Sequence, residues 1–271
     1  MANSRTTILL GALLIATCGC KSVRSVRVES KHPLALTADE AATAGQEGLA
    51  LWAEQPRDLA RVADAARLLE RAARTLREDY EMQCEAAQAL AFVAENGTNA
   101  NTRRDAAKSG VVLARRAREL NPEDVAGHYW YAINVGLLAN ADRLYGLKAV
   151  DEMEPALRRA IELDERYDFA GPLRVLGILY LRTPGPPTSI GSSRKGLRLL
   201  QRAVELFPDY PENYLYLAEA LRDTGRGDEA KQAAQKVLDA APWPDRQFES
   251  SQWKAEAEKF LKTLVAPESS R

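Results

Sequence analysis

The stretch that decides the fold runs from Pro211 to Pro244 and reads PENYLYLAEALRDTGRGDEAKQAAQKVLDAAPWP. Counted from Pro211, apolar residues stand at regular positions: Tyr214 at 4, Leu217 at 7, Ala218 at 8, Leu221 at 11, Ala230 at 20, Ala234 at 24, Val237 at 27 and Pro242 at 32. Gly225 separates the two apolar runs and predicts a turn. We therefore expect two amphipathic helices joined by a short turn.

This spacing is typical of the tetratricopeptide repeat, whose period is about 34 residues. Ala218 and Ala230 are small, so they allow the two antiparallel helices to approach closely. The bulkier positions then fill the space to the next hairpin. One hairpin cannot bury its apolar face alone, so further repeats are expected.

The same frame recurs upstream, in units that begin near Glu81, Ala126 and Ala170. Two further helices, near Ala42 to Glu54 and Arg57 to Arg77, form a degenerate first hairpin, and a last helix from about Asp245 to Val265 is expected to cap the open end. Extra residues predict loops inside the units that begin at Ala126 and Ala170. The sequence thus predicts an all-α tetratricopeptide-repeat array of about eleven helices, irregular and without a sheet, over residues 40–266, with a tail at 267–271.

One helix end occurs in four copies: LLERAARTLREDY, LARRARELNPED, LRRAIELDERYD and LQRAVELFPDYP. Each copy combines an apolar stripe with Arg and Glu on the outer face and then breaks at Asp or Pro. This recurrence supports the repeat array independently of the 34-residue frame.

The N-terminus resembles a bacterial lipoprotein signal. Residues 1–19 carry Arg5 and then an apolar run that is too short to span a bilayer, which needs about 20 residues. Cys20 follows Gly19 and is the expected lipidation site, whereas Cys18 follows Thr17 and fits less well. Residues 20–39 would form a lipidated tether. In enterobacteria, an aspartate directly after the lipidated cysteine retains a lipoprotein in the inner membrane. Because Lys21 stands there, we expect the protein to be anchored at the periplasmic face of the outer membrane.

The balance of charges argues against nucleic-acid binding, and the cysteine content argues against an intrachain disulfide. Lys plus Arg number 37 against 38 Asp plus Glu, with the signs interleaved, so the chain lacks the basic field that nucleic acids require. If Cys20 is acylated, Cys84 has no disulfide partner and is expected to be a small buried apolar residue.

No catalytic constellation is found in the sequence. The two histidines, His32 and His128, are far apart, and there is neither a nucleophile motif nor a glycine-rich phosphate loop. We therefore predict a protein that is not an enzyme and that uses no metal and no cofactor.

Two stretches are candidate binding sites. The first is an aromatic cluster that includes Tyr129, Trp130 and Asn134, which could line a cavity or simply pack between helices. The second includes Arg174 and Tyr180 and ends in the Pro/Gly loop with Pro187, Ser189 and Gly191, which could bind a ligand or be a plain surface loop.

The runs HYWYAINVG and ELDERYDFAGPLRVLGILYLRTPGPPTSIGSSRKGLRLLQRAVELFPDYPENYLYLAEAL resemble the T-component of tripartite ATP-independent periplasmic (TRAP) transporters. The resemblance covers about Ala41 to Ala241. It implies a lipoprotein of irregular tetratricopeptide repeats, a periplasmic solute-binding protein as partner, a homotrimer and an internal passage for an apolar small molecule. The passage would draw on Trp130, Asn134, Arg174, Tyr180 and the loop from Pro187 to Gly191.

Two functions remain open at this point. The first is an accessory, ligand-holding lipoprotein of a solute uptake system. The second is a scaffold lipoprotein that helps to assemble an outer-membrane or envelope complex through its concave groove. An open groove with exposed aromatic side chains would favour the scaffold, and a closed cavity would favour the ligand-holding protein.

Overall fold

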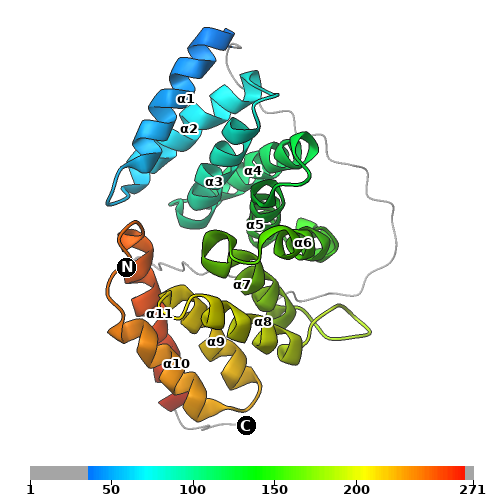
Figure 1. Cartoon of the computed structure of the whole chain (residues 1–271), viewed down its shortest axis with the longest axis vertical. Helices are drawn as coiled ribbons and strands as arrows, with labels where there is room; N and C mark the ends of the chain where they lie inside the picture. The colour runs from blue at the N-terminus through cyan, green and yellow to red at the C-terminus, as the bar shows by residue number, and fades with distance from the viewer. Residues whose placement is uncertain (1–35, 266–271) are drawn as a thin grey trace.

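The computed structural model describes residues 36–265, and in that part of the chain it contains eleven α-helices and no strand (Figure 1). This confirms the all-helical prediction and its number of helices. The helices are α1 (Ala38–Ala53), α2 (Leu59–Thr75), α3 (Tyr80–Asn96), α4 (Ala100–Leu120), α5 (Val125–Ala141), α6 (Arg143–Asp164), α7 (Tyr167–Arg182), α8 (Ser193–Leu206), α9 (Pro211–Asp223), α10 (Gly227–Asp239) and α11 (Gln247–Val265).

The first ten helices pair as five hairpins, from α1 with α2 to α9 with α10. Odd-numbered helices also contact one another from hairpin to hairpin, α1 with α3, α3 with α5, α5 with α7 and α7 with α9. The odd-numbered helices therefore form the inner side of a curved array, which Figure 1 shows as an arc around α11.

Polar side chains define where several helices begin. Each cap accepts a hydrogen bond from a backbone N–H of the first turn, which has no partner inside the helix. The capping residues are Thr37 before α1, Asp58 before α2, Asp79 before α3, Asn99 before α4, Asp124 before α5 and Ser192 before α8.

The recurring helix end has a structural basis in three successive hairpins. Arg116, Arg159 and Arg202 each form an ion pair with the turn before the preceding odd-numbered helix, at 2.5 Å to Glu78, 2.6 Å to Glu123 and 2.6 Å to Glu165. The alanine after each arginine is fully buried. The repeated Arg-Ala unit thus combines close helix packing with an ion pair inside the hairpin. Because these pairs are solvent-exposed, each contributes about 0–1 kcal/mol.

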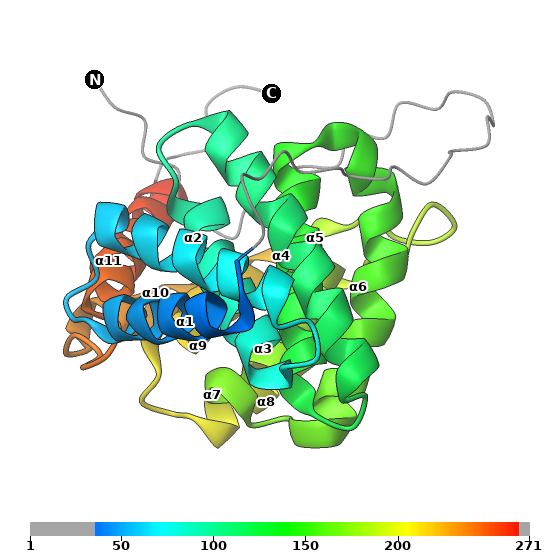
Figure 2. The same cartoon turned by 90° about the horizontal axis from the view of Figure 1, so that it is seen from above.

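Only one of the two predicted inserted loops exists. The Pro/Gly segment between α7 and α8 is a loop that projects from the body in both views (Figures 1 and 2). The prediction of a loop between α5 and α6 is wrong, because Asp142 alone separates these helices and the extra residues lengthen α6. The segment after Asp142 contains Lys148, Ala149 and Met153, which favour helix, and it lacks the Pro/Gly cluster of the other insertion.

Helix α11 closes the concave side of the array instead of only covering its end. It packs against α10 and α9, and side chains of its N-terminal half contact the first two hairpins. Glu249 forms an ion pair with Arg57, and Gln252 donates a hydrogen bond of 3.1 Å to Asn96 Oδ1. The rings of Phe248 and Phe92 lie 5.5 Å apart. The beginning and the end of the helical array are therefore in contact.

The predicted signal peptide, Cys18, Cys20 and most of the tether lie outside the described residues, as does the tail. Within residues 36–265, no helix combines the length and apolar character that a membrane span needs.

Candidate binding cavity

A partly enclosed cavity of about 100 Å³ lies between the odd-numbered helices and α11. Its wall combines aromatic rings with charged groups. The aromatic residues are Trp52, Phe92, Tyr129, Trp130, Tyr216 and Trp253, and the acidic and basic ones are Arg57, Glu95, Asp168, Arg174, Glu212, Arg246, Glu249 and Glu256.

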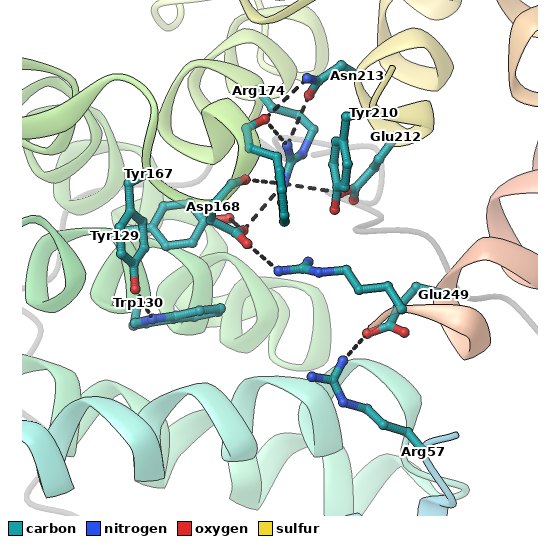
Figure 3. A network of polar contacts seen from close by, with 12 residues as sticks. Arg57, Tyr129, Trp130, Tyr167, Asp168, Arg174, Tyr210, Glu212, Asn213 and Glu249 are labelled. Atoms are coloured by element: carbon teal, nitrogen blue, oxygen red, sulfur yellow. Dashed lines mark hydrogen bonds and ion pairs between the residues drawn. The ribbon is translucent and has the colours of Figure 1, made fainter. Parts of the chain in front are cut away.

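A break at the start of α7 carries Asp168 into this cavity (Figure 3). Asp168, Phe169 and Ala170 have φ values of 47°, 55° and 64°, in the left-handed region. That region costs a residue with a side chain about 1–2 kcal/mol. Strain of this kind persists only where surrounding contacts hold it, and it is concentrated at functional sites.

Arg174 is the main contact that holds the break. Its side chain is 2% exposed, and Nη1 donates hydrogen bonds to the Phe169 carbonyl at 3.2 Å and to Asn213 Oδ1 at 3.0 Å. The Nη2 atom forms ion pairs with Asp168 at 3.4 Å and with Glu212 at 3.1 Å. Because the left-handed turn leaves backbone carbonyls without helical partners, the guanidinium of Arg174 stabilises the turn and balances two buried carboxylates.

Asp168 is ionised in this setting. Its Oδ2 accepts a hydrogen bond of 2.6 Å from the Tyr129 hydroxyl, and its Oδ1 pairs with Arg246. Burial opposes ionisation, but the guanidiniums of Arg246 and Arg174 outweigh it, so the pKa of Asp168 lies below its usual value. The same contacts favour the charged form of Arg246, whose pKa is raised despite burial by its attraction to Asp168.

Two other carboxyl groups of the cavity have raised pKa values. Burial raises the pKa of Glu212, and Arg174 and Arg246 offset this only in part. Burial, followed by the negative charges of Glu212, Glu256 and Glu249, raises the pKa of Glu95 to about 8. Glu95 forms no hydrogen bond or ion pair with any side chain among residues 36–265, so its carboxyl lines the cavity without a protein partner.

Three buried polar atoms of the cavity wall also have no hydrogen-bond partner within the described part of the chain: Nε of Arg57, Nε of Arg174 and Oε2 of Glu249. Buried polar atoms in folded proteins are nearly always paired with protein groups or with water. A cavity with unsatisfied donors and acceptors is therefore suited to a polar occupant.

The structure brings three of the predicted site residues together, because Tyr129, Trp130 and Arg174 all line the cavity. Trp130 Nε1 donates a hydrogen bond of 3.1 Å to the Tyr167 hydroxyl (Figure 3).

Asn134 has a different role. Its Nδ2 donates to the carbonyls of Ala87 at 3.0 Å and Trp130 at 2.9 Å. A Cβ atom built on Gly110 would lie 1.9 Å from Asn134 Oδ1, so the amide fits against the backbone of α4. Asn134 thus joins α3, α4 and α5 and does not line the cavity.

The remaining predicted residues lie apart from the cavity. The Tyr180 hydroxyl forms hydrogen bonds of 2.7 Å with both Glu154 and Arg158. Pro187 is exposed and Ser189 is half-buried in the projecting loop. Gly191 is buried where a Cβ atom would lie 1.9 Å from the Thr183 carbonyl oxygen, which explains the glycine sterically.

The sequence analysis missed most of the charged wall. A helical pattern could have revealed part of it, since residues at i, i+3, i+4 and i+7 share one helix face. On α3 these are Gln88, Ala91, Phe92 and Glu95, and on α11 they are Glu249, Gln252, Trp253 and Glu256. The pattern that indicates these wall residues is a carboxylate on a helix face that also carries large apolar residues.

Family comparisons agree with this architecture. Residues 194–247 match the family model described as tetratricopeptide repeat. The chain has a tetratricopeptide-repeat fold. Residues 52–173 match the family model of regulator of microtubule dynamics protein 1-3, a likeness that covers less than half of the chain. No curated protein matches the sequence at a significant level.

Solved structures include proteins of similar fold. The tetratricopeptide-repeat protein TTC0263 of Thermus thermophilus is 22% identical, with 81% of this chain and 99% of that chain covered and a TM-score of 0.58. MamA of Desulfovibrio magneticus RS-1 is 18% identical, with 74% and 94% covered and a TM-score of 0.49. PilF of Pseudomonas aeruginosa is 17% identical, with 86% and 95% covered and a TM-score of 0.49.

Tetratricopeptide-repeat proteins generally bind protein partners on their extended surfaces without catalysis. Neither matching family model describes an enzyme. Among residues 36–265, no three His, Cys, Asp or Glu side chains are grouped as a metal ion would require.

Proposed function

We propose that this chain is a non-enzymatic binding protein that serves as the accessory T-component of a TRAP-type solute uptake system. Its helical array holds a small ligand and associates with a periplasmic solute-binding protein. The observation that carries this proposal is the closure of the concave side by α11, which converts a groove into a cavity with unsatisfied polar atoms.

The closure distinguishes a ligand-holding protein from a groove-binding scaffold. A repeat scaffold that binds a peptide in its concave groove needs that groove to be accessible. Here Trp130 of α5 and Trp253 of α11 line the same cavity and are only 9% and 7% exposed. Aromatic side chains that could attract a partner segment are thus already covered by the chain itself.

The nature of the cavity modifies what the TRAP resemblance implies about the ligand. A volume of about 100 Å³ is smaller than the roughly 150 Å³ of a protein cavity that holds benzene, so the cavity admits only a small molecule. The wall also carries eight acidic or basic side chains. A small polar molecule therefore suits the cavity better than the apolar ligand that the resemblance implies.

Native mass spectrometry of the full, detergent-solubilised chain tests the proposal. We expect a bound molecule of low mass that is released on mild activation, and a trimer if the resemblance extends to assembly. We also expect the chain to co-purify with a periplasmic solute-binding protein. A ligand-free monomer that binds no solute-binding protein would exclude this function.

An envelope scaffold is the second candidate function, and one surface feature favours it. A groove of about 210 Å³ between α2, α3 and α4 is lined by Arg74, Arg77, Arg116 and Val112, the last of which is 42% exposed. Basic side chains around an exposed apolar residue would suit an acidic segment of a partner protein. Replacing Val112 by Glu would weaken partner binding if this groove is used and would leave it unchanged if the cavity alone is functional.

A further inference from the structure

The excess of carboxylates in the cavity indicates the charge of its ligand. Five acidic side chains line the wall, Glu95, Asp168, Glu212, Glu249 and Glu256, against three arginines. With all groups ionised, the wall carries a net charge of two negative units (three minus five). This net negative charge would repel a bound anion and attract a bound cation, so a cation is electrostatically favoured.

The three arginines are also already engaged. Arg57 pairs with Glu249, Arg246 pairs with Asp168, and Arg174 pairs with both Asp168 and Glu212. Glu95, by contrast, has no hydrogen-bond or ion-pair partner among residues 36–265. The Nε atoms of Arg57 and Arg174 remain without a partner in the described part of the chain, but each guanidinium is already paired with at least one carboxylate. Glu95 is thus the charged group of the wall that lacks an opposite charge.

The aromatic wall suits a cation as well. The guanidinium carbon of Arg57 lies 4.4 Å from the centroid of the Trp52 ring and 5.4 Å from that of Phe92. Aromatic faces attract cations within about 6 Å of the ring centroid. The same helix face of α3 carries Phe92 and, three residues later, Glu95, so a ligand cation at Glu95 would lie close to an aromatic ring.

A second acceptor lines the same space. Oε2 of Glu249 is buried and accepts no hydrogen bond from the described residues, although Oε1 of the same carboxylate pairs with Arg57. An ammonium group has three N–H donors and no acceptor, and a guanidinium has five N–H donors. Either head group could satisfy Glu95 and Glu249 together, which a neutral ligand with a single donor could not.

We propose that the cavity is a binding site for a small organic cation, an alkylammonium or guanidinium head group, with Glu95 as its counter-ion. This rests on the proposed function, in which the cavity holds the ligand. The cavity volume limits the bound portion to a few non-hydrogen atoms.

Ligand binding should depend on pH through Glu95. The empty site favours the neutral carboxyl, because burial and nearby carboxylates raise the pKa of Glu95 to about 8, so a cation would displace its proton. Affinity should rise about tenfold per pH unit below 8 and level off above it. The charged groups that act on Glu95 are Glu212 on α9, Glu249 and Glu256 on α11 and Arg246 before α11. Asp168 and Arg174 on α7 and Arg57 before α2 line the same cavity.

Isothermal titration calorimetry of the full chain with n-propylamine tests the proposal, in phosphate buffer at pH 8, which contains no amine. We expect saturable binding of n-propylamine with a Kd below about 1 mM, and none of n-propanol or propionate at the same concentration. Glu95→Gln should weaken binding of the amine at least tenfold and abolish its pH dependence. Glu81→Gln, an exposed position on the same helix, should change neither.

Each other outcome overturns the inference in a recognisable way. Equal binding of n-propanol would make the site apolar, and unchanged binding by Glu95→Gln would place the cation elsewhere. Absence of amine binding together with a neutral or anionic molecule in the native mass spectrum would reject the cation and keep the ligand-holding function. Absence of both would reject the two proposals together. Circular dichroism of Glu95→Gln establishes that the variant is folded.

Discussion

Glu95 differs from Asp168, Glu212 and Glu249 because each of these three carboxylates is paired with an arginine, whereas Glu95 has no such partner among the described residues. Such a carboxyl group remains neutral near pH 7, and the folded protein loses stability when the group ionises. This behaviour gives a stability signal that can be measured without any ligand.

Glu95→Gln should therefore stabilise the protein only at high pH. The folded-state pKa of about 8 lies above the ordinary value of 4.5, so stability from the protonated group is fully present below pH 4.5 and is lost as the pH rises through 8. Glutamine stays neutral throughout. Thermal unfolding should give nearly equal stability at pH 4.5 and a gain of up to about 5 kcal/mol for the variant at pH 9, since each pKa unit corresponds to about 1.4 kcal/mol. A gain of the same size at both pH values would refute the shifted pKa.

Gly110 should not tolerate a side chain, because the Asn134 amide occupies the space. Gly110→Ala is expected to destabilise the fold by about 1–3 kcal/mol through overpacking. Gly227→Ala is the matched control, since nothing lies within 4 Å of its built Cβ atom. Chemical denaturation of both variants and of Gly110→Ala combined with Asn134→Ala gives the test.

The combined variant should be less destabilised than the sum of its two single changes, because removing the amide makes room for the new methyl group. Strict additivity would show that Asn134 does not pack against Gly110.

At the scale of the elements, only a few side-chain contacts hold α11 against the first hairpins. The Arg57–Glu249 ion pair joins side chains that are 13% and 15% exposed. Breaking one partner of a buried pair typically costs about 3–5 kcal/mol, since the remaining charge is buried alone. The pair is therefore a point at which closure can be tested.

Arg57→Glu and Glu249→Arg should each lower the melting temperature, and the double exchange should restore much of it. Differential scanning calorimetry of the three variants measures this coupling. Losses that simply add in the double exchange would indicate that α11 is not held to the first hairpin by this pair.

The elements also show where sequence reasoning succeeded. Helices and hairpins were predictable because their signals are local: apolar periodicity, capping residues and the Pro/Gly segment at Thr183 to Gly191. The extension of α6 was mistaken for a loop because the 34-residue frame predicts where an insertion lies and not what conformation it takes. The left-handed turn at Asp168 has no glycine to indicate it, since Arg174 and Asn213 stabilise it from outside.

In the whole molecule, the cavity arises from curvature that accumulates over five hairpins. Tyr129, Trp130 and Arg174 could be predicted as site residues from their own segments, since aromatic and charged residues on inward helix faces indicate binding. Arg57 and Glu249 could not be linked in this way. They are 192 positions apart in the sequence, and only the closure of the array brings them together.

The central claim is that α11 closes the concave side of the array over a ligand-binding cavity. Hydrogen–deuterium exchange of the intact chain, with and without n-propylamine, tests it most directly. We predict that the amides of α11 exchange as slowly as those of α9, and that the amine further slows exchange in α11, α3 and residues 54–58 together. Rapid exchange throughout α11, unaffected by the amine, would contradict the account.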